Sequence, residues 1–288
     1  MSDNKLDKNK DKKKVSVTPH SWDGIEEYNN PAPRWWLIVW LICTIWAIGY
    51  WILYPTWPIK GGNTKGILGW TKYSKLEESQ KDIEIRKSAT LKRFSKSSFK
   101  QIQQDPELME FAMRGGSAIF KNICSACHGS GAAGGKGFPN LNDDDWLWGG
   151  KIEEIYQTLL YGIRSGHENA RMSQMPSFGV DKLLNKKQIE QVSEYVLSLS
   201  GKGEYNKEGE KIFKANCVVC HGKNAKGNHE IGSPNLTDQI WLYGSDRSDL
   251  FYTIYFSRYG AMPAWLGRID RQGIRQVALY VHSLGGGE

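Results

Sequence analysis

The sequence predicts an all-α protein with one N-terminal transmembrane helix followed by two tandem copies of one helical module. Two observations carry this prediction: an uncharged run of 20 residues begins at Trp35, and a long C-terminal segment occurs twice. With 24% charged residues and only 5 Cys in 288 residues, the chain is neither disordered nor a disulfide-stapled miniprotein. The predicted parts are a tail over 1–34, a membrane segment over 35–57, a linker over 58–106, and modules over 107–201 and 202–288.

The uncharged run WWLIVWLICTIWAIGYWILY covers residues 35–54. At about 1.5 Å per residue, a helix of this length matches the roughly 30 Å hydrocarbon core of a bilayer. Half of the 12 Trp lie in or just after the run, where several fit interfacial aromatic belts. A buried core helix is the alternative, but an all-round apolar helix of this length is rare in soluble domains. A cleaved signal peptide would begin closer to the N-terminus. Cys43, in the middle of the run, is best interpreted as a small packing residue.

The distribution of Lys and Arg around the predicted span does not fix its orientation. Residues 15–34 contain one such residue and residues 55–74 contain three, whereas the Lys-rich run over 5–14 restores the balance. The positive-inside rule is therefore silent here, and a chemical argument has to decide the orientation.

An internal repeat follows the span. The segment GSAIFKNICSACH at 116–128 recurs as GEKIFKANCVVCH at 209–221. The match continues with Pro-Asn-Leu at 139–141 and 234–236, and with a Trp-Leu-aromatic-Gly block at 146–149 and 241–244. Met-Pro recurs at 175–176 and 262–263, and a closing helical segment recurs at 191–199 and 276–284. A repeat of this length indicates two copies of one structural module.

Each copy carries Cys-x-x-Cys-His. Helical positions i, i+3 and i+4 share a face, so all three side chains of each motif project toward one partner. Two thiols can then form thioethers with the vinyl groups of a haem while the imidazole binds its iron. A thioredoxin-type site needs a βαβ context that is absent, and a four-cysteine zinc site or local disulfides would leave the histidines without a role. We therefore predict two covalently bound haem c groups, held by Cys124, Cys127 and His128 and by Cys217, Cys220 and His221.

The second axial ligand of each iron is predicted to be a methionine. Met175 and Met262 both precede proline, which removes a competing amide donor. A Met and His ligand pair raises the reduction potential and leaves no vacant position for oxygen, so such an iron passes electrons. Met172 is the local rival of Met175 but has no partner in the repeat. His167 and His229 can in principle ligate, although a solvated loop histidine is the simpler interpretation of each.

Other repeated residues are expected to support the haem. Phenylalanines one helical turn before the first cysteine can pack on tyrosines of the closing helices, and nearby glycines allow the close approach. The carbonyl of each repeated Pro-Asn-Leu proline can accept the Nδ1 proton of the iron-binding histidine, which fixes the tautomer. These residues are Phe120, Phe213, Tyr195, Tyr280, Gly116, Gly209, Pro139 and Pro234.

The two modules resemble class I cytochromes c. The whole chain from about residue 20 onward is similar to the membrane-anchored dihaem subunit of cbb3-type cytochrome c oxidases. The motifs that carry this resemblance are WDGIEEYNNPAPRWW at 22–36, YPTWP at 54–58 and NLNDDDWLWGG at 140–150. The resemblance implies two tandem class I cytochrome c domains after the membrane helix.

The resemblance also implies a function. The chain would relay electrons from a soluble or anchored cytochrome c donor to a separate haem–copper subunit that reduces oxygen, within a proton-pumping respiratory complex that also holds a monohaem cytochrome c subunit. The chain itself would have no catalytic residue and no nucleic-acid partner. Since c-type haem is attached outside the bacterial cytoplasm, the haem domains would lie in the periplasm, with one pass through the inner membrane and a cytoplasmic N-terminus.

Two alternatives stay open at this point. The chain can be an anchored dihaem carrier of another periplasmic dehydrogenase or reductase complex, which only the motifs just quoted argue against. A dihaem peroxidase needs an iron with an open position, and two Met-Pro pairs disfavour it. The linker over 58–106 is expected to let the modules stand off from the bilayer. The acidic run over 143–145 can help to dock a basic donor, with a solvated loop as the default.

Overall fold

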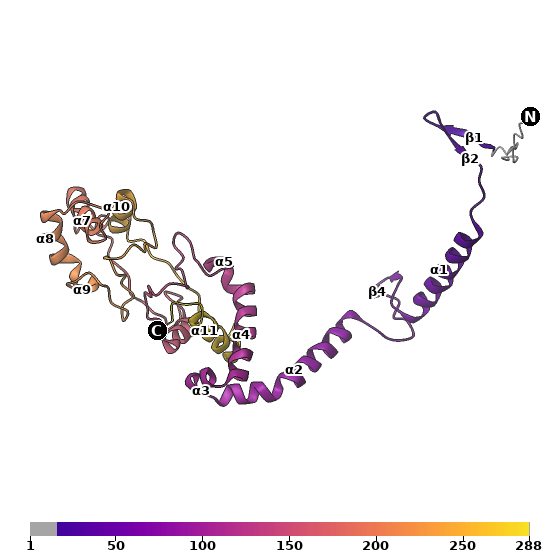
Figure 1. Cartoon of the computed structure of the whole chain (residues 1–288), viewed down its shortest axis with the longest axis horizontal. Coiled ribbons are helices and arrows are strands. Elements are labelled where there is room, and N and C mark those ends of the chain that lie inside the picture. The colour runs from indigo at the N-terminus through magenta and orange to yellow at the C-terminus, as the bar shows by residue number, and fades with distance from the viewer. Residues whose placement is uncertain (1–15, 288) are drawn as a thin grey trace, which may run out of the picture. The chain divides into compact units, whose positions relative to one another are not determined.

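The computed structural model describes residues 16–287, so the first part of the predicted tail lies outside it. The chain divides into two compact units, one ending at Arg86 and one beginning at Lys87. The described part is mainly helical, with two small two-stranded antiparallel sheets (Figure 1). The all-α prediction is therefore confirmed apart from these two hairpins.

The first unit contains the predicted membrane helix, α1 (Arg34–Leu53). Within the described residues it is the one helix long and apolar enough to cross a bilayer, and none of its residues is buried. A hairpin of β1 (Val17–Trp22) and β2 (Ile25–Tyr28) precedes it. Its two connecting residues, Asp23 and Gly24, both have positive φ, as a tight hairpin turn requires.

The C-terminal end of α1 is closed by the chain that follows it. After a short hairpin of β3 (Pro58–Ile59) and β4 (Gly62–Asn63), the N–H of Ile67 donates to the Ile52 carbonyl at 3.0 Å. Gly66 makes this return possible, since its φ is +66° and a Cβ there would lie 2.5 Å from the Leu53 oxygen. Backbone carbonyls that the helix leaves unpaired are thereby satisfied.

The second unit holds the repeated segments, and α2 (Lys72–Lys96) leads into it. Its further helices are α3 (Phe99–Gln104), α4 (Pro106–Ile119), the π-helical turn η1 (Phe120–Cys124), α5 (Ser125–His128), α6 (Ile152–Tyr161), α7 (Lys186–Leu199), α8 (Lys207–Asn216), α9 (Val218–His221), α10 (Arg247–Phe256) and α11 (Arg271–His282).

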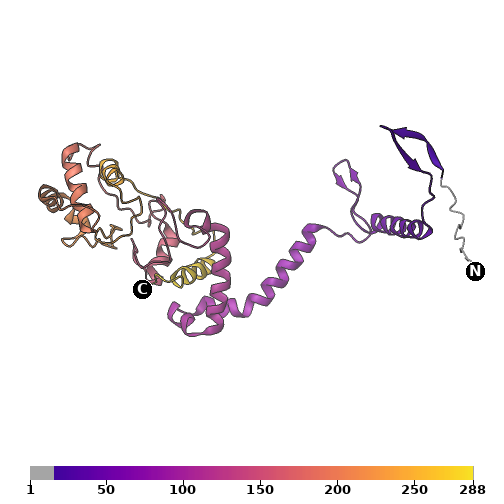
Figure 2. The same cartoon turned by 45° about the horizontal axis from the view of Figure 1, so that its top comes forward.

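The helices of this unit form two halves that do not coincide with the two sequence repeats (Figures 1 and 2). In the first half, α11 packs on α4 and α6; in the second half, α7 packs on α8 and α10. The closing helix of each repeat thus packs on the opening helix of the other. The short connection over residues 200–206 explains why α7 packs on α8, because elements joined by short loops usually become neighbours.

The aromatic contacts follow the same exchange. Phe120 packs on Tyr280 with ring centroids 5.5 Å apart, and Phe213 packs on Tyr195 at 5.4 Å. The predicted contact between each phenylalanine and a closing-helix tyrosine is confirmed. Each tyrosine, however, comes from the other repeat.

Two glycines allow the exchanged helices to approach closely. A Cβ on Gly116 would lie 2.4 Å from the carbonyl oxygen of Gln276 in α11. A Cβ on Gly209 would lie 2.1 Å from the carbonyl oxygen of Gln191 in α7. Neither helix pair could keep its present separation with a side chain at these positions.

The structure differs from the predicted linker over 58–106 at the C-terminal end of that range. Phe94 and Ile102 are fully buried, in one cluster with Leu108 of α4 and Leu279 of α11. Arg275 of α11 donates to the Phe94 carbonyl at 2.9 Å and to the Ser97 carbonyl. Apolar positions spaced through a polar segment gave too weak a pattern to reveal this packing.

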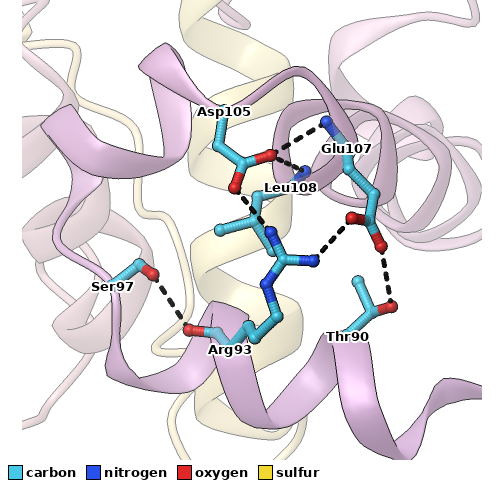
Figure 3. A network of polar contacts seen from close by, with 6 residues as sticks. All are labelled: Thr90, Arg93, Ser97, Asp105, Glu107 and Leu108. Carbon is cyan, nitrogen blue, oxygen red and sulfur yellow. Dashed lines mark hydrogen bonds and ion pairs between the residues drawn. The ribbon is translucent and has the colours of Figure 1, made fainter.

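An ionic network holds the corner between α2, α3 and α4 (Figure 3). The Arg93 guanidinium donates to Asp105 at 2.7 Å and to Glu107 at 2.5 Å. Asp105 also caps α4, since its other carboxylate oxygen accepts the backbone N–H groups of Glu107 and Leu108. From Lys87 onward the segment is part of the compact second unit.

Candidate haem sites

One cavity of about 790 Å³ lies within the second unit and is lined by both halves. It collects all the side chains that the sequence analysis assigned to haem binding: Cys124, Cys127, His128, Met175, Cys217, Cys220, His221 and Met262. The part of this cavity beside each Cys-x-x-Cys-His motif is called its crevice, and the two crevices form one continuous space.

Each Cys-x-x-Cys-His motif lies where a helix is interrupted and then stopped. In the first motif, α4 passes through η1 before the short α5, and in the second, α8 ends at Asn216 before α9. Gly129 and Gly222 follow the histidines with φ of +79° each and end the helices. A π-helical turn such as η1 is often found at functional sites.

Each histidine is oriented by a proline carbonyl, as predicted. Nδ1 of His128 lies 3.0 Å from the carbonyl oxygen of Pro139, and Nδ1 of His221 lies 3.1 Å from that of Pro234. Since a carbonyl only accepts, Nδ1 carries the proton in both rings. Nε2 is left with a free lone pair for a metal.

Burial determines the protonation of these groups. It lowers the pKa of His128 and of His221, against the opposing effect of the proline carbonyls, so both imidazoles are neutral at pH 7. Burial raises the pKa of Cys124 to about 11 and that of Cys217 to about 12, with the second cysteine of each motif adding to the shift. The first thiols of the haem-free chain are therefore protonated near neutral pH.

Met262 lies in the first half, although it belongs to the second repeat. Its side chain packs against the core cluster that contains Phe120 and Leu159, and Cys124 packs against the same cluster. Its backbone exchanges two hydrogen bonds of 2.9 Å with Ile163, in the loop after α6. These contacts bring Met262 to the crevice of the first Cys-x-x-Cys-His motif.

Met175 lies in the second half, although it belongs to the first repeat. It packs against the cluster that contains Phe178, as do Ile212 and Ile254. The same two isoleucines pack against the cluster that contains Phe213, against which Cys217 also packs. The hydroxyl of Ser257, at the end of α10, donates to the Met175 carbonyl. The two Met-Pro loops are thus exchanged in the same way as the closing helices.

Three family models match the sequence. They are the N-terminal domain of cytochrome oxidase-cbb3, FixP, over residues 14–60; cytochrome c, over residues 113–200; and cytochrome c oxidase, cbb3-type, subunit III, over residues 205–281. A cbb3-type cytochrome c oxidase subunit FixP of Bradyrhizobium sp. (strain ORS 278) is 51% identical over 278 residues, which cover 95% of this chain and 96% of the relative. A subunit CcoP of Cereibacter sphaeroides is 49% identical over 279 residues, covering 94% and 95%.

The chain belongs to the family of cbb3-type cytochrome c oxidase subunits FixP and CcoP. The resemblance stated from the sequence motifs is confirmed, and so is the assignment to an electron-transfer subunit with two cytochrome c domains. Relative to those domains, the structure adds that the surroundings of each Cys-x-x-Cys-His motif draw on both sequence repeats.

The rival ligands considered from the sequence lie elsewhere. Met172 is 67% exposed. His167 accepts the backbone N–H of Asn169 at its Nδ1, and its ring lies tilted against that of Tyr161, so its contacts are local. In the described part of the chain, neither His167 nor His229 lines the cavity.

The cavity fits a bound haem c in this cbb3-type subunit. The indole N–H groups of Trp241 and Trp265 are buried, line the cavity and have no hydrogen-bond partner among residues 16–287. Each unpaired donor costs about 1–3 kcal/mol. Acidic groups of a ligand in the cavity can accept from these donors, and the carboxylates of haem c have that chemistry.

Three side chains at the site escaped the sequence analysis. Trp241 belongs to the repeated Trp-Leu-aromatic-Gly block, so a signal was available. Trp265 lies three residues after Met262, and Phe178 lies three residues after Met175. The two repeats thus have different residue types at this position, and the repeat pattern does not mark Trp265. Arg164 lines the cavity from the loop after α6, and nothing in the sequence pattern distinguishes it from other loop arginines.

Proposed function

We propose that this cbb3-type subunit carries two haem c groups, one in each crevice. Cys124 and Cys127 tether the first, whose iron is bound by His128. Cys217 and Cys220 tether the second, bound by His221. The observation that carries the proposal is the repeated geometry of a half-buried imidazole whose Nδ1 is held by a proline carbonyl.

The methionine ligands are proposed in exchanged order. Met262 completes the first haem and Met175 the second, because each lies in the core that surrounds the other repeat's Cys-x-x-Cys-His motif. The order along the chain, in which Met175 follows His128 and Met262 follows His221 within each repeat, favours the opposite pairing. When bound, such six-coordinate haems supply reversible one-electron transfer.

The surrounding residues prepare the site for this role. The proline carbonyls hold each imidazole in one tautomer, and Phe120, Phe213 and the two closing helices exclude water from the crevices. The continuous cavity brings the two haems into one chamber of the protein. A chain with two such haems receives electrons at one and delivers them from the other.

The wider setting is proposed from the family. The chain passes electrons from a cytochrome c donor toward an oxygen-reducing haem–copper subunit, with a monohaem cytochrome c subunit in the same proton-pumping complex, and does no catalysis itself. The haem domains lie in the periplasm and the N-terminus in the cytoplasm of a bacterium, since haem c attachment takes place outside the cytoplasm. The described helix α1 supports a single-pass anchor.

Optical redox titration of the full chain in detergent tests the haems and their ligands. We expect two low-spin haem c groups per chain, each with the absorption band of methionine-ligated ferric iron. Met175→His and Met262→His should each remove that band from one haem and lower its potential, whereas Met172→His should change neither haem. One haem per chain, or a response to Met172→His, would contradict the proposal. Peroxide-driven turnover by the isolated chain would favour a peroxidase instead.

A further inference from the structure

Arg164 occupies an unusual position between the two crevices. It follows α6 with φ of +48°, a conformation that non-glycine residues seldom adopt. Its backbone N–H donates to the Arg171 carbonyl at 2.8 Å, which holds the turn. Its side chain lines the shared cavity, with the guanidinium 5.7 Å from the ring centroid of Tyr259.

The Arg164 guanidinium is bonded to both methionine loops at once. Its Nε donates to the carbonyl of Gly260 at 2.6 Å, two residues before Met262. Its Nη1 donates to the carbonyl of Ser173, two residues before Met175. One side chain therefore links the segments that carry the two proposed axial ligands.

Two other half-buried loop arginines provide a contrast. Arg171 donates to the Thr158 hydroxyl at 2.9 Å and to a carbonyl of the same helix, α6. Arg258 donates in the same way to the Thr253 hydroxyl at 2.9 Å and to Asp249, both in α10. Each of these side chains folds back on the helix that precedes it and stays within one half. Arg164 instead joins loops of both halves.

The chemistry of arginine suits this task. The guanidinium is planar and always charged, and its five N–H donors point in fixed directions, so two separate carbonyls can be held by one rigid group. A lysine ammonium on a flexible stem lacks that fixed fork. Displacing one loop by as little as an ångström would disturb a metal ligand on it, since coordination depends on position.

We propose that Arg164 is a positioning residue that fixes both methionine loops together, so that methionine ligation at the two haems is coupled. This inference rests on the proposed function, because it requires Met175 and Met262 to be iron ligands. Within that scheme, Arg164 touches neither iron. It acts on each haem through the backbone two residues before the ligand.

The test compares variants of the full haem-loaded chain in detergent. Arg164→Gln removes the fork, and Arg171→Gln is the matched control, since it removes a loop arginine of similar burial from the first half alone. The readouts are the methionine-to-iron absorption band of the ferric chain, resolved by redox titration into its two haems, together with haem content. We expect Arg164→Gln to lose at least half of the band at both haems, and Arg171→Gln to leave the second haem unchanged.

Arg164→Lys keeps the charge but removes the planar fork, so it separates the effect of geometry from that of charge. It also provides the test if Arg164→Gln fails to retain haem. We expect the lysine variant to keep both haems but to lose methionine ligation at one or both. Full recovery of both bands with lysine would mean that charge alone suffices, and would overturn the proposal. So would a response at only one haem, or at neither, in Arg164→Gln. If the wild-type chain itself lacks methionine-ligated haem, the proposed function fails rather than this inference.

Discussion

The two halves of the second unit use the same parts but are built differently along the chain. Both have a phenylalanine packed on a closing-helix tyrosine, a glycine at the helix crossing, and a histidine held by a proline carbonyl. The second half is one continuous stretch that runs from the Met175 loop to α10. The first half begins before that stretch and is completed only when Met262 and α11 return after it.

The difference teaches that a sequence repeat and a packed domain need not be the same object. Two copies of one module carry interchangeable closing helices, because their apolar faces match. Which copy pairs with which is then decided by connection length, and the short link over residues 200–206 favours α7 beside α8. Each copy consequently contributes a closing helix and a methionine to its neighbour.

Truncation before the Met262 loop should affect the two halves most unequally. A chain ending after Arg258 lacks Met262 and α11, whose residues Ile274 and Val277 are buried in the core of the first half. We expect the haem at His128 to lose its methionine ligand outright. The haem at His221, whose proposed ligand Met175 stays in the chain, should be affected less, through loss of the Arg164 contact to the Gly260 carbonyl. Haem-specific redox titration checks this. Damage confined to the haem at His221 would show that each repeat folds on itself.

Substitution of the core phenylalanines tests each half separately. Phe120→Ala and Phe213→Ala remove rings that are almost fully buried, and each should cost about 3–5 kcal/mol of stability. Because the partners are exchanged, Phe120→Ala should increase amide hydrogen exchange in α11, and Phe213→Ala should increase it in α7. The opposite assignment of the two helices would contradict the exchanged packing.

The glycines at the two helix crossings test the close approach of the helices in each half. Gly116→Val and Gly209→Val place a side chain against a backbone carbonyl of the facing helix, and each should destabilise its half by about 1–3 kcal/mol. The exposed Gly131, around which a Cβ would meet nothing within 4 Å, gives the control Gly131→Ala. Thermal unfolding monitored at the haem bands measures all three. Equal effects at the crossing and control positions would exclude the close approach.

The smallest expected effect distinguishes the two halves by charge. Burial, followed by the nearby Asp238, raises the pKa of Asp145 to about 6, whereas the equivalent position of the second repeat is Ile240. The folded chain therefore holds this proton more tightly than the unfolded chain, and stability is lost as the pH rises from about 4 through about 6. Asp145→Asn abolishes this titration. Over this pH range the variant should therefore lose about 1 kcal/mol less stability than the wild type, after allowance for solvent screening.

Unfolding of wild type and Asp145→Asn by denaturant, at about pH 4 and about pH 7.5, measures this effect. The variant should gain stability relative to wild type at the higher pH only. An equal difference at both pH values would mean that Asp145 does not titrate in this range.

Local chemistry was predictable from the sequence, and long-range pairing was not. The apolar helix α1, the Cys-x-x-Cys-His motifs and the prolines that hold the histidines depend on residue type at short spacing, which a sequence displays directly. The exchange of Met175 and Met262 depends on which of two similar surfaces α7 and α11 meet. Sequence similarity between repeats conceals that choice, because both solutions satisfy the same pattern.

The role of Arg164 escaped prediction for a related reason. Its partners are backbone carbonyls of Ser173 and Gly260, and any residue could supply a carbonyl at those positions. The buried end of the predicted linker was missed because Phe94 and Ile102 are isolated apolar residues in polar surroundings. Both features become visible only when distant segments are placed side by side.

The central claim is that each haem crevice combines a Cys-x-x-Cys-His motif from one repeat with a methionine from the other. An experimental structure of the haem-loaded chain tests it most directly, through the identity of the sulfur bound opposite His128. The exchanged arrangement predicts the Sδ of Met262 at that iron and the Sδ of Met175 at the iron of His221. Met175 opposite His128 would contradict it.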